Sequence, residues 1–128
     1  MRNEDMVILF VDDEVSILHA LERYLLHEPF CLLSAQSGKQ ALEIMRKQSV
    51  HIIVTDMKMP EMDGLELLKS VKKQFPDTVR LVLSGYSRLS SIIPAINSGE
   101  IYRYISKPIE PDIFRKTLRN AIDFYLIN

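Results

Sequence analysis

Residues 51–64 of the chain read HIIVTDMKMPEMDG, and this stretch decides the fold because it passes from strand to loop to helix. The apolar, β-branched run at its start predicts a buried strand that ends at Asp56. Pro60 and the pair Asp63-Gly64 predict a loop, and the apolar residues after Gly64 predict a helix. In an open α/β sheet, ligands bind outside the carboxyl ends of the strands, where Asp56 would lie. A single aspartate in this place more often forms a turn than a ligand site, so the assignment of Asp56 depends on the rest of the chain.

The same alternation of strand and helix occurs five times. Strands are expected at residues 6–11, 30–35, 51–56, 79–83 and 101–106, each followed by a helical pattern. Such a series predicts an α/β fold, a doubly wound (βα)5 domain whose five-stranded parallel sheet is covered by helices on both faces. Pro94 interrupts the fourth helical pattern, residues 87–98, so we expect either a kinked helix or a short one that begins near Pro94. The last helix should begin at Pro111 and turn six residues inward: Ile113, Phe114, Leu118, Ala121, Ile122 and Tyr125.

Composition limits the possible functions. A chain of 128 residues with 47% hydrophobic and 26% charged residues fits one globular domain, residues 1–128. A net charge of −1 gives no reason to expect a nucleic-acid surface. Cys31 is the only cysteine and has apolar neighbours, so we expect no internal disulfide and a buried thiol. No signal peptide and no apolar run long enough for a membrane span is present in the sequence, which predicts a cytoplasmic protein with no membrane contact.

Polar groups of a particular kind follow four of the five expected strands: Asp12-Asp13, Asp56, Ser84 and Lys107. The carboxyl ends of parallel strands lie side by side, so these side chains should converge. Two like charges at ~4 Å repel by roughly 4 kcal/mol at an effective dielectric constant of about 20. Three carboxylates therefore need a cation beyond Lys107, and Mg²⁺ is the natural oxygen-binding candidate.

Other phosphate and nucleotide sites fit less well. Asp12, Asp13 and Glu14 after the first strand would repel a flavin phosphate, and neither G-x-x-x-x-G-K-[ST] nor G-x-G-x-x-G occurs. A haloacid-dehalogenase-type phosphatase needs a second aspartate two residues after its nucleophile, and Lys58 stands there.

Four segments resemble the motifs of the receiver domain of two-component response regulators, in order and in spacing. They are residues 11–14 (VDDE), 55–64 (TDMKMPEMDG), 83–85 (LSG) and 105–108 (ISKP). The resemblance covers nearly the whole chain and implies the flavodoxin-like strand order 2-1-3-4-5. It also implies that Asp56 accepts a phosphoryl group from a histidine kinase or a phosphotransfer protein.

The resemblance assigns the remaining roles. Asp13, Asp56 and the backbone carbonyl of Lys58 would bind Mg²⁺, and Asp12 would act on it through water. Lys107 would contact the phosphoryl group, while Ser84 and Tyr104 would be the switch residues. The chain itself is then a signalling domain and not an enzyme, and any catalytic output would lie in a domain beyond residue 128.

Two other functions stay open at this point. One is a receiver-like interaction module that is never phosphorylated, although such modules typically lack one of the acidic residues or the lysine. The other is a small Mg²⁺-dependent phosphatase, which Lys58 disfavours.

We further expect a cis Lys107-Pro108 bond. We also expect the chain to be the N-terminal module of a longer protein. The apolar residues Phe124, Leu126 and Ile127 exceed what one sheet face needs, which indicates dimerisation or output-domain docking on the face of the fourth helix, fifth strand and last helix. Residues 84–86 and 95–104 resemble receivers joined to HD-GYP-type phosphodiesterases or histidine kinases more than receivers joined to DNA-binding domains.

Overall fold

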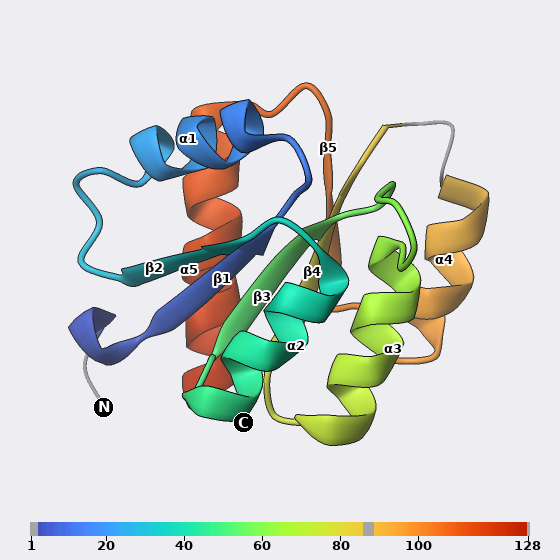
Figure 1. Ribbon diagram of the computed structural model, residues 1–128. Helices are drawn as coiled ribbons and strands as arrows, with labels where there is room; N and C mark the ends of the chain where they lie inside the picture. The colour runs from blue at the N-terminus through green and yellow to red at the C-terminus, as the bar shows by residue number, and fades with distance from the viewer. Residues whose placement is uncertain (1–2, 86–88, 128) are drawn as a thin grey trace.

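The computed structural model describes residues 3–85 and 89–127. Five parallel strands form one sheet in the order β2-β1-β3-β4-β5, as the sequence predicts (Figure 1). The strands are β1 (Val7–Val11), β2 (Cys31–Ala35), β3 (Ile52–Asp56), β4 (Val79–Ser84) and β5 (Arg103–Ser106). A short 3-10 turn, η1 (Asn3–Asp5), precedes them. The helices are α1 (Val15–Tyr24), α2 (Gly38–Lys47), α3 (Gly64–Gln74), α4 (Leu89–Asn97) and α5 (Pro111–Ile127).

The sheet separates two hydrophobic cores. Successive residues of a strand point to opposite faces, so Ile8 and Phe10 of β1 pack beneath α1 and α5. Leu9 and Val11 of the same strand pack beneath α2, α3 and α4. Because both faces are covered, the central strands are mostly apolar, which explains the hydrophobic runs in the sequence.

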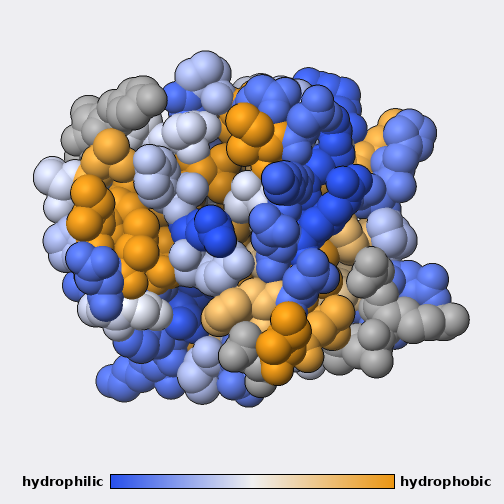
Figure 2. Space-filling model, turned by 180° about the vertical axis from the view of Figure 1, so that it is seen from behind, coloured by the Kyte–Doolittle hydropathy of each residue, from blue (hydrophilic) through white to orange (hydrophobic). Residues whose placement is uncertain are grey.

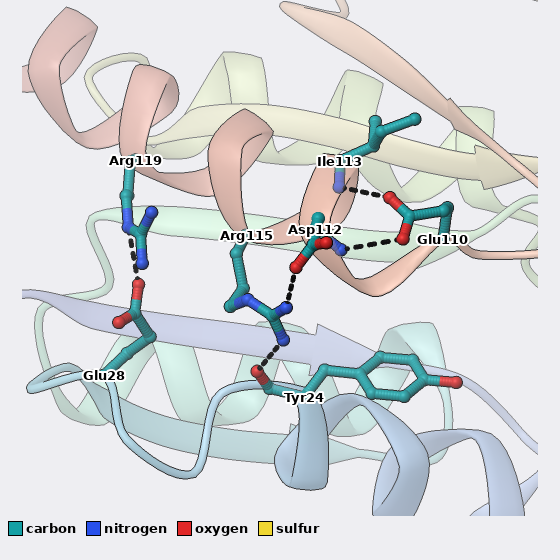
Figure 3. Close-up of polar contacts among 7 residues, drawn as sticks. All are labelled: Tyr24, Glu28, Glu110, Asp112, Ile113, Arg115 and Arg119. Carbon is teal, nitrogen blue, oxygen red and sulfur yellow. Dashed lines mark hydrogen bonds and ion pairs between the residues drawn. The ribbon is translucent and has the colours of Figure 1, made fainter.

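Polar contacts fix α5 against the end of α1 and the loop that follows it (Figure 3). The Arg115 guanidinium donates to the backbone carbonyl of Tyr24 at 3.0 Å and also pairs with Asp112. Nε of Arg119 lies 2.7 Å from Oε1 of Glu28. These contacts join segments 91 residues apart in the chain and hold α5 along its face of the sheet.

Two expectations about burial are wrong. Cys31 is exposed, because it is the first residue of β2, an edge strand of the sheet. Ile113 is 62% exposed, and the buried stripe of α5 begins one residue later, at Phe114. The side chain of Ile113 instead lines a surface cleft beside Tyr104.

The fourth helix continues through Pro94. Its described part begins at Leu89 and ends at Asn97, so a short helix beginning near Pro94 is not formed. Four of the five strands begin one or two residues later than the sequence predicts, with β5 beginning at Arg103, and β4 ends one residue later, at Ser84. Tyr86, part of the resemblance to HD-GYP-linked receivers, lies outside the described residues. Among the described residues, no helix has the length and apolar character needed to cross a bilayer.

Candidate functional site

The carboxyl ends of four strands bring the expected side chains together at one edge of the sheet. Asp12 directly follows β1, and Asp56 is the last residue of β3, the strand next to it. Ser84 ends β4, and Lys107 directly follows β5. The backbone N–H of Lys107 donates to the carbonyl of Ser84 at 2.9 Å, so this lysine is tied to the neighbouring strand.

Three carboxylates form the centre of the site. One oxygen from each of Asp12, Asp13 and Asp56 lies within 4.8 Å of the others. Asp12 is only 1% exposed and Asp56 only 7%, whereas Asp13 is open to solvent. Asp13 thus stands at the mouth of the site and the other two line its interior.

The two carboxylate oxygens of Asp12 have different surroundings. Its Oδ1 accepts a hydrogen bond from the backbone N–H of Glu14 at 2.9 Å. Its Oδ2 is buried and has no hydrogen-bond partner among the described residues. Burial, with the charge of Asp56 as a further contribution, raises the pKa of Asp12 to about 6. A buried, unpaired carboxylate oxygen beside two further carboxylates suits a hard divalent cation, so the donor set fits Mg²⁺.

Among the residues that the structure describes, Lys107 supplies the positive charge in contact with Asp56. Its Nζ lies 2.5 Å from Oδ1 of Asp56, and about a third of the lysine side chain is exposed. The Lys107-Pro108 bond is cis, as expected from the sequence. The ammonium therefore offsets the charge of one of the three carboxylates.

An open cleft of about 310 Å³ leads to Asp56 from the surface. Lys58, Ser84 and Lys107 line it, and Glu14 stands at its side. The Ser84 side chain is 2% exposed, and its hydroxyl donates to the carbonyl of Gly85 at 3.0 Å. The cleft therefore connects Asp56 to the surface, with a hydroxyl and an ammonium on its walls.

Gly64 supports the site in a way that the sequence did not reveal. A Cβ at this position would lie 2.3 Å from the carbonyl oxygen of Asp56 and 3.0 Å from Cα of Met57. The N–H of Gly64 donates to the carbonyl of Met57 at 2.8 Å, which closes the loop after β3. The Asp63-Gly64 pair indicated a turn, but only the folded chain shows that the glycine touches the backbone of Asp56.

Asp63 and Glu66 hold the other side of that loop. The Asp63 carboxylate accepts from the N–H of Glu66 at 2.9 Å, and the Glu66 carboxylate accepts from the N–H of Asp63 at 3.1 Å. This capping box fixes the start of α3 and therefore the position of Gly64.

Tyr104 is not part of the Asp56 cleft. Its side chain is 37% exposed and lines a second cleft of about 280 Å³ between β5 and the start of α5. Ser84 and Lys107 line the same cleft as Asp56. Tyr104, the expected switch aromatic, instead lines the second cleft together with Ile113.

The match to known families defines the class of protein. The family model for the response regulator receiver domain matches residues 8–119. The chain therefore belongs to the response regulator receiver domains of two-component systems.

Curated relatives are transcriptional regulatory proteins of much greater length. The hydrogenase transcriptional regulatory protein HoxA of Bradyrhizobium diazoefficiens is 40% identical over 118 residues, which are 92% of this chain and 24% of that protein. The transcriptional regulatory protein ZraR of Escherichia coli K12 is 33% identical over 95% of this chain and 27% of its own length. The chain thus spans about a quarter of the length of the curated relatives it matches.

Solved structures show the same fold. The signal receiver domain of an HD domain-containing protein from Pseudomonas fluorescens Pf-5 is 35% identical, with a TM-score of 0.89 over 98% of this chain and 92% of that one. A response regulator receiver domain protein from Clostridium thermocellum is 30% identical, also with a TM-score of 0.89, over 96% of this chain and 98% of that one. The relatives therefore include receivers attached to different kinds of output.

Proposed function

We propose that the chain is a phosphoacceptor switch in which Asp56 takes a phosphoryl group from a histidine kinase or a phosphotransfer protein. The observation that carries this proposal is the pairing of Asp56 with Lys107 at 2.5 Å inside a group of three converging carboxylates. Asp56 ends a strand whose five residues are all buried, so its position is fixed before a donor arrives.

The reaction can be written with the residues at hand. One carboxylate oxygen of Asp56 bonds to phosphorus, and the bond between phosphorus and the donor imidazole nitrogen breaks with its electron pair going to that nitrogen. The imidazole leaves as the neutral ring, keeping the proton that its other nitrogen already carries. Lys107 can offset negative charge on the phosphoryl oxygens, because its ammonium already contacts the acceptor.

Asp12, Asp13, Asp56 and the backbone carbonyl of Lys58 are the proposed Mg²⁺ ligand set, with Asp12 acting through water. A bound divalent cation would supply positive charge to the transferring phosphoryl group. The proposal is supported by the convergence of three carboxylates and by the unpaired Oδ2 of Asp12.

The response to phosphorylation is proposed to begin at Ser84. Its hydroxyl now donates to the adjacent Gly85 carbonyl, and it could donate to a phosphoryl oxygen instead. Such a change would move the loop after β4 and let Tyr104 turn inward from its exposed position.

The face formed by α4, β5 and α5 is the proposed surface for an output domain or for a second copy. Exposed apolar side chains on these elements support it: Ile93, Tyr104, Ile113, Phe124, Leu126 and Ile127. Apolar areas are also visible between hydrophilic ones on the side of the molecule shown in Figure 2. Analytical ultracentrifugation with and without phosphoryl donor tests this part, since an Ile113→Glu variant should weaken any donor-dependent association.

Intact-mass spectrometry tests the central proposal. Incubation with Mg²⁺ and acetyl phosphate should add one labile phosphoryl group to the wild type and none to Asp56→Asn. Asp77→Asn, an exposed aspartate in the loop before β4, is the matched control and should label like the wild type. Labelling of Asp56→Asn at the wild-type level would refute the assignment. Turnover of the donor without an adduct would favour a phosphatase, and no reaction at all would favour an interaction module.

A further inference from the structure

A buried imidazole lies at the amino edge of the sheet, opposite the candidate functional site. His51 directly precedes β3 and is 7% exposed. Its Nδ1 accepts a hydrogen bond at 2.9 Å from the N–H of Val7, the first residue of β1. A ring nitrogen that accepts a hydrogen bond carries no proton, so the ring is neutral and its proton is on Nε2. The fold therefore selects one tautomer and one charge state of His51.

The backbone of His51 is held from both sides without the ring. Its N–H donates to the carbonyl of Val7 at 3.0 Å, and its carbonyl accepts from the N–H of Val79, at the start of β4, at 2.9 Å. A second proton on the ring would leave the backbone contacts intact, but it would set one N–H against the N–H of Val7. Protonation must therefore turn the ring away from Val7 while the backbone of His51 stays in place.

The same ring contacts the last turn of α5, residues 124–127. Tyr125 meets the imidazole edge to face, with ring centroids 5.0 Å apart and 80° between the ring planes. Figure 1 shows this end of α5 beside the start of β3. The neighbouring Phe124 stacks on Tyr102, with ring centroids 4.6 Å apart. Of these two ring contacts, the one with His51 has a partner that titrates near neutral pH.

The surroundings of the ring determine when it takes up a proton. Burial lowers the pKa of His51 below its ordinary value, although the charge of Asp5 on η1 opposes this shift. A cavity of about 650 Å³ adjoins His51 and Tyr125, so the ring has room to turn into it and be hydrated. Besides Tyr125, the titratable or charged side chains that line this cavity are Arg46 and Lys47 of α2 and Asp77 before β4.

We propose that His51 is a proton-operated clasp that ties β1 to the last turn of α5. In its neutral form the ring binds Val7 and packs on Tyr125, whereas the protonated ring turns into the cavity and releases both. The last turn of α5 then keeps the Phe124 contact and opens more often. This turn also carries Leu126 and Ile127 of the proposed docking face, so acid should weaken association through that face. The effect on association rests on the proposed function, whereas the clasp does not.

Amide hydrogen exchange of the free chain, read residue by residue by NMR, measures the opening. The released ring should titrate with an ordinary pKa of about 6.5, so a change from about pH 7.5 to about pH 5.5 should raise the opening constant by up to about ten-fold. After correction for the intrinsic pH dependence of exchange, protection should fall at Val7 and at residues 125–127. Leu118, earlier on α5 and fully buried, should keep its protection. Constant protection at Val7 and Tyr125, or an equal fall at Leu118, would overturn the proposal.

Asp12 titrates in the same range, since its pKa is about 6, but it cannot produce this result. It follows β1 at the opposite edge of the sheet. A carboxyl whose pKa is raised by folding also makes the fold more stable as the pH falls, which is the opposite sign to the effect of His51.

Matched variants test the cause. His51→Asn can accept the N–H of Val7 without titrating, so the pH dependence should disappear at both ends of the clasp, while His19→Asn, at an exposed histidine of α1, should leave it unchanged. Tyr125→Leu should keep the pH dependence at Val7 and remove it at residues 126–127. Phe124→Leu should keep it at both places. Persistence at residues 126–127 in Tyr125→Leu would contradict the clasp, even if His51→Asn failed to fold.

Analytical ultracentrifugation with acetyl phosphate and Mg²⁺ tests the consequence for the docking face. Donor-dependent association should weaken more between about pH 7.5 and about pH 5.5 in the wild type than in His51→Asn, at equal phosphoryl content by intact mass. Equal weakening in the two proteins would refute control of the face by His51. If no phosphoryl group is taken up, or if the loaded protein does not associate at either pH, the proposed function fails there, and the exchange results still decide the clasp.

Discussion

Replacement of Gly64 by alanine tests whether the backbone after β3 sets the geometry of the site. The new Cβ would lie 2.3 Å from the Asp56 carbonyl oxygen, and its three nearest neighbours are all backbone atoms that cannot rotate away. Overpacking of this kind typically destabilises a protein by about 1–3 kcal/mol. The helix propensity of alanine offsets up to about 1 kcal/mol of that, since Gly64 is the first residue of α3. A 2.3 Å contact with backbone places the cost at the upper end of that range, about 3 kcal/mol, so we expect a net loss of about 2 kcal/mol.

Gly38→Ala is the matched control, because Gly38 is likewise the first residue of a helix, α2. There the new Cβ would meet only the Met62 side chain, with its sulfur nearest at 2.6 Å, and this flexible chain can move aside. Urea unfolding at neutral pH should give a free energy of unfolding within about 0.5 kcal/mol of the wild type for Gly38→Ala. A thermal midpoint roughly 8 °C below the wild type is expected for Gly64→Ala.

The same variant should also lose function. A shift of the Asp56 backbone moves its carboxylate away from Lys107 and from the other carboxylates, so labelling by acetyl phosphate should slow at least ten-fold at temperatures where the variant is folded. Wild-type stability together with wild-type labelling in Gly64→Ala would refute the view that this contact positions the site.

Three further predictions concern charge. Lys107→Met removes the ammonium that competes with a metal ion for Asp56, so isothermal titration calorimetry should show roughly ten-fold tighter Mg²⁺ binding, a gain of about 1.4 kcal/mol. The variant should nevertheless be labelled poorly by acetyl phosphate. Weaker Mg²⁺ binding than in the wild type would contradict this prediction. Asp12→Asn should raise the metal-free free energy of unfolding by about 1–2 kcal/mol, because it removes a buried, unpaired charge, while the exposed Asp13→Asn should change it little. Burial lowers the pKa of His51, whose Nδ1 accepts the N–H of Val7, so stability should fall as the pH drops below 6.5, where the unfolded chain gains a proton more readily. His51→Asn can accept the same hydrogen bond without titrating, so the free energy of unfolding measured with urea should fall less steeply with pH below 6.5 than in the wild type. An unchanged pH dependence would exclude His51 as its cause.

Much of the fold follows from the sequence because each strand is a short apolar run that ends in a polar residue. Continuous apolar runs indicate strands that are covered on both faces, and such strands are typical of a parallel sheet. The carboxyl ends of parallel strands share one edge of the sheet. The convergence of Asp12, Asp56 and Lys107 was therefore predictable from strand ends alone, before any contact was known.

Other features depend on which strands are neighbours, and no local pattern contains that information. Cys31 has apolar neighbours in sequence, but its strand lies at the edge of the sheet. Ile113 belongs to an apolar helical stripe that begins before the helix reaches the core. Arg80 appears in the sequence as one charge within an apolar strand, and its carbonyl partners lie up to 20 residues away.

The charges at the site suggest why its parts depend on one another. Three carboxylates and one ammonium leave two negative charges unbalanced, and Asp12 holds one of its oxygens buried without a donor. The metal-free fold must bear that repulsion, because the ends of β1 and β3 fix the backbone beside Asp12 and Asp56, and Gly64 lies against the backbone of Asp56. Any cation that binds here therefore adds to stability as well as to reactivity, by the linkage between binding and folding. A variant that relaxes the backbone at Gly64 should consequently reduce the stabilisation by Mg²⁺, and one that removes the charge of Asp12 should reduce both the repulsion and the need for the ion.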